Sequence, residues 1–247
     1  MPVNSTLMIL PNRIKKSLFL PVLALFSILQ VNAQQAGVKN LPKYDFQTIH
    51  FGFTLGLNFS DLKVDLVPDF RTIDSIYVIE SEPVAGLNLG IIANLRIGNH
   101  FDLRFIPALS FAQRNMVYSI TYLDTLRSVS TKNVESNYLE FPVELKFKSE
   151  RIRNYRVYVL AGFKYSFDMI SQATVETGEK EIVKLKKADY GYEIGLGFDF
   201  YMPYFKFSPE IKMYQGLNNL LVKDGRPLSN PLEGLFSKVF TLSFTFE

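Results

Sequence analysis

The sequence predicts an all-β fold: an eight-stranded antiparallel barrel of the outer-membrane type, which crosses a membrane with its strands. Three observations lead to this prediction. Eight segments alternate apolar and polar residues with a period of two, as strands do when their two faces meet different surroundings. Each segment has about the 9–11 residues that a tilted strand needs to cross a bilayer. The connections between them alternate between short and long, as in outer-membrane barrels.

The beginning of the chain has the layout of a secretory signal peptide. Three basic residues, Arg13, Lys15 and Lys16, precede the apolar stretch SLFLPVLALFSIL, and the small residues after it mark a cleavage site after Ala33. Residues 1–33 are therefore predicted to be removed, which leaves 247 − 33 = 214 residues. A retained N-terminal anchor is the alternative, although the apolar stretch is short for a membrane-spanning helix.

The predicted mature chain begins with a lead-in over residues 34–48, which is polar, lacks periodicity and is expected to lie in the periplasm. The barrel is expected to cover residues 49–247. Its eight strands are predicted from the alternating runs Ile49–Phe59, Gly86–Ile97, Phe101–Arg114, Asn137–Phe147, Val157–Asp168, Tyr190–Phe200, Phe205–Tyr214 and Val239–Phe246.

The first four runs place large apolar residues on one face and small or charged residues on the other. In IHFGFTLGLNF, Phe and Leu alternate with Gly, Thr and Asn, and in GLNLGIIANLRI, Leu and Ile alternate with Asn, Gly and Arg. FDLRFIPALSFAQR sets Phe and Leu against Asp, Arg and Ser. NYLEFPVELKF sets Leu, Phe and Val against two Glu and one Lys.

The last four runs repeat the pattern and decide between a soluble sheet and a membrane barrel. VYVLAGFKYSFD, YGYEIGLGFDF, FKFSPEIKMY and VFTLSFTF alternate aromatic and aliphatic residues with Gly, Ser, Thr and charged residues. Glycine on a water-facing strand costs stability and packs against nothing. In a narrow barrel it makes room for long neighbouring side chains. The apolar face is therefore predicted to meet lipid, and the polar face to line the lumen.

The predicted lumen carries acids and bases in similar number, which favours a network of ion pairs over an ion filter of one sign. Eight strands enclose an interior that side chains can fill, so a permissive pore is not expected. The predicted network consists of Arg96, Asp102, Arg104, Arg114, Glu140, Glu144, Lys146, Lys164, Asp168, Glu193, Asp199, Lys206, Glu210 and Lys212.

The connections predict which end of the barrel faces which side. Short turns are expected in the periplasm and long loops outside, so that both termini are periplasmic. The predicted long loops are Asp61–Pro83, Met116–Asn133, Met169–Ala188 and Gln215–Ser237, and the short turns are Gly98–His100, Ser149–Tyr155 and Tyr201–Pro203. Pro107, Pro142 and Pro209 fall inside strands, where the loss of a donor predicts bulges.

The composition excludes several functions. The chain has no Cys, and its net charge of +3 gives no reason to expect nucleic-acid binding. Its two histidines, His50 and His100, are expected at the periplasmic rim without partners spaced for a triad. We therefore predict no enzymatic activity, cofactor, metal or small-molecule substrate. Paired carboxylates in the lumen are more readily explained by ion pairing with nearby bases.

Four strings carry a resemblance to a known family: NLPKYDFQTIHFGFTLGLNFSD, NYLEFPVELKF, YQGLNNLLVKDG and LEGLFSKVFTLSFTFE. They resemble segments of the PorT family of outer-membrane barrels. The first is similar to that family's lead-in and first strand, and the second to its central strand. YQGLNNLLVKDG and LEGLFSKVFTLSFTFE are similar to its last loop and strand. The likeness covers essentially the whole predicted mature chain. The strand patterns also fit the wider group of eight-stranded, porin-like barrels.

This resemblance implies a role in type IX secretion and gliding motility in Bacteroidetes-type bacteria, in the export of cargo with C-terminal sorting domains. It implies a barrel in outer-membrane lipid that binds or stabilises other secretion components in that membrane or the periplasm. It offers no catalytic residues. The candidate partner contacts that it suggests are Asn40, Leu41, Pro42, Tyr44, Asp45, His50, Gly216, Leu217, Asn218 and Asn219.

Two other interpretations stay open at this point. The candidate contact residues have a local alternative, because proline fixes an extended lead-in and asparagines stabilise turns. The chain as a whole could instead be a free-standing barrel for envelope integrity or surface adhesion. A lipid-modifying barrel enzyme would need a polar cluster open to lipid, and the outward faces supply none.

Overall fold

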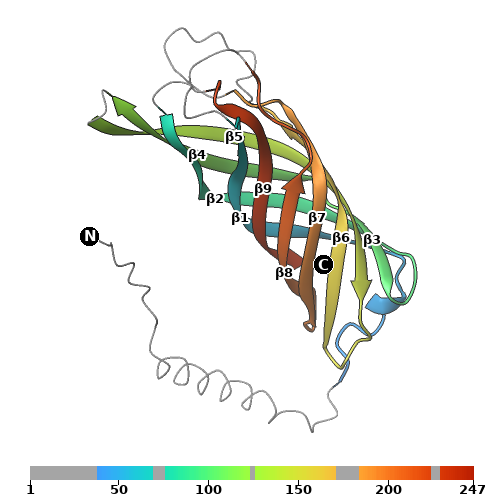
Figure 1. The fold of residues 1–247 in the computed structure, drawn as a ribbon. Coiled ribbons are helices and arrows are strands. Elements are labelled where there is room, and N and C mark those ends of the chain that lie inside the picture. Colours follow the sequence, from blue (N-terminus) through green and yellow to red (C-terminus); the bar gives the residue numbers. More distant parts are fainter. Residues whose placement is uncertain (1–37, 69–75, 123–125, 171–183, 224–228) are drawn as a thin grey trace, which may run out of the picture. The chain divides into compact units, whose positions relative to one another are not determined.

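The computed structural model describes residues 38–68, 76–122, 126–170, 184–223 and 229–247, so the predicted signal peptide lies outside the described residues. From Lys39 onward the described chain forms a ring of antiparallel strands (Figure 1). A one-turn 3-10 helix, η1 (Tyr44–Phe46), precedes the first strand. The strands are β1 (Ile49–Leu66), β2 (Ile76–Arg96), β3 (Phe101–Phe105), β4 (Ala108–Tyr122), β5 (Leu126–Lys148), β6 (Tyr155–Asp168), β7 (Ala188–Tyr201), β8 (Lys206–Gly216) and β9 (Leu232–Phe246).

The nine labelled strands make an eight-stranded barrel, because β3 and β4 are two halves of one strand interrupted at Pro107. Both halves pair with β2 on one side and β5 on the other, and β1 closes the ring by pairing with β2 and β9. The predicted fold is therefore confirmed. Within the described ring, closure gives every strand a partner on both sides, as a sheet in lipid requires.

The predicted bulges at the three prolines are wrong. Pairing keeps one register across Pro107, from Ala93–Phe105 to Gly90–Ala108, and it runs unbroken through Pro142. Pro209 is paired with Phe244 of β9, and on its other side the pairing with β7 is interrupted between Gly197–Glu210 and Phe200–Phe207 without a change of register. Each proline lacks a backbone donor, but the carbonyls of two of them still accept: Ile91 N donates to Pro107 O at 3.0 Å and Ile106 N to Pro142 O at 3.2 Å. The register shifts of the described strands lie instead at Asp65/Leu66, Ile76/Val78 and Pro83/Leu87.

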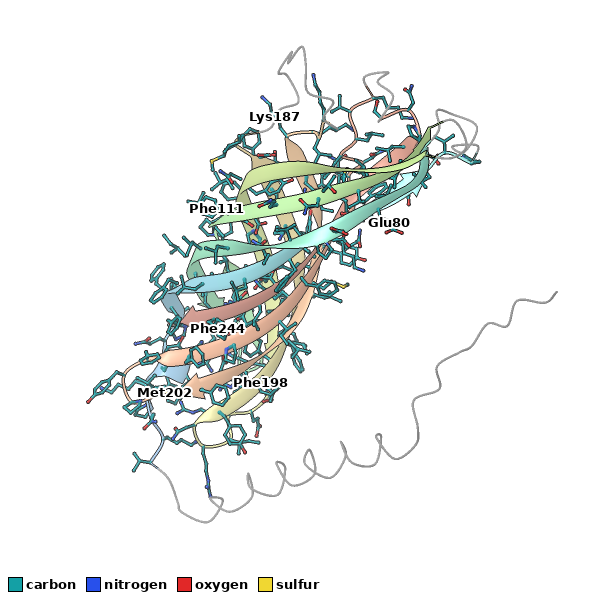
Figure 2. All side chains as sticks on the ribbon, turned by 90° about the vertical axis from the view of Figure 1, so that its left-hand side faces the viewer. Glu80, Phe111, Lys187, Phe198, Met202 and Phe244 are labelled. Carbon is teal, nitrogen blue, oxygen red and sulfur yellow. The ribbon has the colours of Figure 1, made fainter. Side chains whose placement is uncertain are left out.

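The wall has the predicted two faces. Large apolar side chains such as Phe111 and Phe198 are exposed on the outside (Figure 2), whereas the inward positions are mostly polar and buried. No helix in the described ranges is both long and apolar enough to span a bilayer. The arrangement fits a barrel whose outer belt meets lipid and whose polar residues satisfy one another inside.

The two ends of the barrel differ. At the short-turn end, β2–β3, β5–β6 and β7–β8 are joined by residues 97–100, 149–154 and 202–205. Two of the predicted loops at the other end, the long-loop end, are partly strand: β1 continues to Leu66, β2 starts at Ile76, β4 ends at Tyr122 and β5 begins at Leu126. The predicted bounds of these two loops, Asp61–Pro83 and Met116–Asn133, were therefore too wide; in the second, β-branched residues in VYSITY and RSVST continue the alternation. Most of the predicted loop Met169–Ala188 lies outside the described residues.

Part of the wall extends beyond the ring as a three-stranded sheet, which we call the flap: residues 76–83 of β2, 111–122 of β4 and 126–137 of β5 (Figure 1). Pairing of β1 with β2 stops at Ser60–Val84, and pairing of β5 with β6 stops at Tyr138–Asp168. Pairing within the flap continues to Tyr122–Leu126. The flap is therefore held by its own ladders, by continuity with the barrel and by contacts at its base, where Ile79 and Met116 are buried in an apolar cluster and Leu62 N donates to Ser81 Oγ at 3.1 Å.

Candidate functional site: a filled lumen closed at both ends

Ion pairs fill the centre of the lumen. The guanidinium of Arg104 lies 2.6 Å from the carboxylate of Glu210 and 3.7 Å from that of Glu144. The ammonium of Lys212 lies 2.9 Å from Glu144 and 3.3 Å from Glu193. Four strands, β3, β5, β7 and β8, are thereby linked across the lumen. Charges this deeply buried are tolerated only when they are paired.

The network continues toward both ends. Lys164 lies 3.3 Å from Glu140 and 3.4 Å from Glu193, on the side of the long-loop end. Toward the short-turn end, Lys146 lies 2.9 Å from Asp199, which also accepts a hydrogen bond from Ser208 Oγ at 2.7 Å. Acidic and basic side chains are thus paired along the lumen, and they do not form a continuous row of charges of one sign.

The structure places thirteen of the fourteen predicted network residues inside the barrel. The exception is Arg96, which lies at the short-turn end and donates to Asn99 Oδ1 at 2.9 Å and to the carbonyl of Asp45. The buried thirteen are Asp102, Arg104, Arg114, Glu140, Glu144, Lys146, Lys164, Asp168, Glu193, Asp199, Lys206, Glu210 and Lys212.

Sequence reasoning missed several inward polar residues at strand ends. Lys148, which lies 2.5 Å from Asp102, follows Lys146 by two positions and continues its alternation. Arg156 and Asp189 each precede a predicted run by one position and are buried as well. Extending the period-two pattern by one or two residues would have found all three.

Side chains leave almost no free volume in the lumen. Two cavities of about 20 and 10 Å³ are described there, each with room for about one water molecule. Glycine is needed for this filling at Gly197, where a Cβ atom would come within 2.4 Å of the Tyr158 ring. Tyr158 donates to Glu210 at 2.6 Å and lies beneath Lys146, whose Nζ is 3.5 Å from the ring centroid. The described lumen therefore offers no open path for a solute.

The lead-in closes the short-turn end, and we call residues 40–46 the plug. Asp45 lies 3.1 Å from both Arg151 and Arg156, and it accepts a hydrogen bond from the Tyr201 hydroxyl at 3.1 Å. Arg151 also donates to the carbonyl of Asn40 and stacks over Tyr201 at 3.6 Å. One acidic residue thus joins the lead-in to two strands and a turn.

The other candidate contacts in the plug also face the chain's own barrel. Tyr44 donates to the Glu247 carboxylate at 2.8 Å and stacks on His50 with ring centroids 4.0 Å apart. Asn40 Nδ2 donates to Tyr201 O at 2.8 Å. Leu41 has a left-handed φ of 47°, a strained conformation that its surroundings must hold. Pro42 is exposed. Partner binding by these residues stays a prediction.

The charge on Asp45 makes attachment of the plug dependent on pH. Burial alone raises the pKa of this carboxyl, but Arg156 and Arg151 outweigh burial and hold the pKa below its usual value. Because the pKa of Asp45 is lower when the plug is attached, the ionised carboxylate stabilises attachment at every pH above the ordinary Asp pKa of about 3.9. This stabilisation is lost as the pH falls from that value through the lower pKa of the attached state. We therefore expect the plug to loosen in acid below about pH 4.

A spin label on Phe46→Cys measures this loosening, because Phe46 is exposed and the chain has no other Cys. The label should be immobile at neutral pH and become mobile in acid. In the Asp45→Asn variant the label should be mobile both at neutral pH and in acid. A label that stays immobile in Asp45→Asn would contradict the assignment, and a gel-mobility shift on boiling confirms in each sample that the barrel is folded.

An apolar cluster closes the long-loop end. Leu220 and Leu221 turn into the mouth of the barrel and pack with a buried group that includes Leu235, Leu232 and Met116. The two amides that precede them fix this segment. Asn219 Oδ1 accepts from the N–H groups of both Leu221 and Leu235 at 3.1 Å. Asn218 Nδ2 donates to Ala188 O at 2.8 Å.

The remaining two candidate contacts differ in exposure. Gly216 ends β8 and is buried, with both Asp189 carboxylate oxygens 3.1 Å from where its Cβ would lie. Leu217 is exposed, and its N–H donates to Tyr190 O at 2.9 Å. Leu217 is thus the member of this group whose side chain is open to a partner.

The described residues contain no cluster of three or more His, Asp or Glu arranged to hold a metal ion. His50 is buried against Tyr44, with Nε2 2.8 Å from Tyr44 O, and His100 pairs through Nδ1 with Lys148 O at 3.1 Å. In both histidines the ring nitrogen named here is hydrogen-bonded to a backbone carbonyl. This geometry holds the two rings at the short-turn end and supplies neither with an adjacent nucleophile.

A family model agrees with the fold, and several solved structures are similar to this chain at low sequence identity. Residues 32–222 match the family model described as outer membrane protein beta-barrel domain. Neisserial surface protein A is 10% identical with a TM-score of 0.43, covering 81% of this chain and 98% of its own. OprG from Pseudomonas aeruginosa is 15% identical with a TM-score of 0.41, covering 80% and 93%. The outer membrane protease OmpT from Escherichia coli is 11% identical with a TM-score of 0.43, covering 85% and 97%. No curated protein sequence matches this chain.

Proposed function

The chain belongs to the outer membrane protein beta-barrel domain family, and from this premise we propose that it is a non-enzymatic accessory barrel of type IX secretion, of the PorT kind. It sits in outer-membrane lipid and supports export of cargo with C-terminal sorting domains. It acts by binding or stabilising other components of the apparatus. The resemblance of its lead-in, central strand and last loop to the PorT family supports this proposal.

The proposed orientation follows from export. Residues 1–33 are the cleaved signal peptide, and the lead-in that follows stays in the periplasm. The short-turn end, which carries both the plug and Glu247, then faces the periplasm. The flap faces the outside. A filled lumen leaves the surfaces of the barrel, rather than a channel, for the function.

The observation that carries a binding role is the edge of β5 in the flap, with which no described strand pairs. Along β5, main-chain groups of odd-numbered residues face β6 and those of even-numbered residues face β3 and β4: Met169 N donates to Asn137 O at 2.9 Å, and Ile106 N donates to Pro142 O at 3.2 Å. The β4–β5 register is unbroken over the flap, so this alternation continues beyond the end of β6.

Five residues of the flap therefore direct N–H and C=O groups away from β4. Among the described residues, no strand pairs with them. Such an edge accepts an extended segment of another protein as an added strand. The five are Arg127, Val129, Thr131, Asn133 and Glu135.

The test is export of sorting-domain cargo from a strain lacking the gene. Cargo should accumulate in the periplasm while the envelope stays tight, and the wild-type gene should restore export. Thr131→Pro should fold, because its N–H is directed away from β4, but should not restore export, because proline blocks strand addition. Thr131→Val keeps the donor and should restore it.

Normal export in the deletion strain would contradict the proposal. Leakiness or lost adhesion in that strain would favour the free-standing barrel instead. Restoration by Thr131→Pro equal to wild type would exclude the β5 edge as the binding surface while leaving the secretion role intact.

A further inference from the structure

A groove of about 360 Å³ lies on the outer face of the barrel around Pro107. Its rim includes the exposed side chains Phe53, Ile91 and Leu109, and no residue that lines it is charged. Its volume is within the range of small-molecule sites. It lies within the described wall, at the break between β3 and β4.

The sequence creates this groove by placing a short ring among long side chains. Pro107 is flanked along its own strand by outward Phe105 and Leu109, and it lies across from Ile91 on β2. Because the register is unchanged across the break, these longer neighbours keep their outward positions. The proline leaves a depression between them.

The floor of the groove is closed toward the lumen. A Cβ atom on Gly90 would lie 2.9 Å from Thr54 Cγ2, 3.0 Å from Ala108 Cβ and 3.2 Å from Ile106 Cγ2. These side chains fill the space behind the wall, and Ile106 is buried. The groove is therefore blind: it opens outward and does not lead into the barrel.

We propose that this groove is a binding site for one acyl chain of a membrane lipid. It is continuous with the exposed apolar belt that faces lipid in an outer-membrane barrel, so acyl chains are the molecules that reach it. An acyl chain in the groove contacts apolar side chains from β1, β2, β4 and β5. An acyl chain elsewhere on the outer wall contacts the protein along only one of its own sides. The site recognises the chain and makes no charged contact with a headgroup.

Native mass spectrometry of the barrel, purified in mild detergent and incubated with phosphatidylethanolamine or phosphatidylglycerol, tests the site. The wild type should retain one lipid of either kind. Leu109→Trp fills the groove and should lose that lipid. Leu196→Trp makes the same change at an exposed outward position of β7 and should keep it.

Three outcomes would overturn the proposal: no retained lipid, equal retention in Leu109→Trp and wild type, or equal loss in both tryptophan variants. Retention of only one of the two lipids would point to a headgroup site elsewhere and would overturn it as well. The gel-mobility shift on boiling shows that each variant is folded before it is measured.

Discussion

Replacing Arg104 with Met is expected to lower the free energy of unfolding by about 3–5 kcal/mol, the cost of leaving a buried charge without its partner. Arg104 is fully buried, 2.6 Å from Glu210 and 3.7 Å from Glu144. Its removal leaves Lys212 to compensate both carboxylates, and Lys212 lies 4.0 Å from Glu210. The deficit is therefore centred on Glu210.

Urea unfolding of the barrel in lipid vesicles, followed by loss of the fast-migrating band on unboiled gels, measures this cost. Lys63→Ala is the control, because its ion pair with Asp65 at 3.2 Å is exposed and should contribute about 1 kcal/mol or less. Adding Glu210→Leu to Arg104→Met should recover part of the loss. A cost for Arg104→Met no larger than that of Lys63→Ala would contradict the buried network.

Replacing Gly162 with Ala is expected to cost about 3 kcal/mol, at the upper end of the range for overpacking. Its Cβ atom would lie 2.2 Å from Val143 O and 2.8 Å from Glu144 Cα. Both atoms belong to the backbone of β5, so a rotamer change cannot relieve the contact. The β5–β6 ladder would have to shift in the middle of the wall.

Gly98→Ala is the matched control, because no atom lies within 4 Å of its Cβ position. The same unfolding measurement compares the two variants, and a lower yield of the folded, fast-migrating form should accompany Gly162→Ala. Equal stability of the two variants would show that β5 and β6 are spaced more widely at this point than described.

The sequence was sufficient to predict the wall of the barrel, because a strand between lipid and a polar lumen imposes strict alternation. Phe141 faces outward and Glu140 and Glu144 face inward because successive residues of a strand point to opposite faces. The number of strands and the spacing of the short turns follow from the same pattern. Predicting bulges from prolines failed because a proline in a continuous ladder can lose one donor without changing the register.

The closures and the flap were harder to predict, because they depend on contacts between residues far apart in the chain. Asp45 lies in a polar segment without periodicity, and only the fold brings Arg151 and Arg156 to it. Leu220 and Leu221 lie in a short apolar stretch of a predicted loop, and the sequence does not indicate that they pack against Leu235. The candidate contacts were chosen by resemblance, and the structure gives most of them neighbours within the chain.

We propose that the barrel, whose described lumen is filled and closed at both ends, acts through its surfaces. Ion conductance across a planar lipid bilayer that contains the purified protein tests whether the lumen is closed. We expect the protein to insert, as verified by the gel-mobility shift of the same preparation, without stepwise current at neutral pH, because the two cavities described inside the lumen measure about 20 and 10 Å³. Stable, ohmic current steps from the wild-type barrel would contradict it, and transport through the lumen would then be the function to pursue.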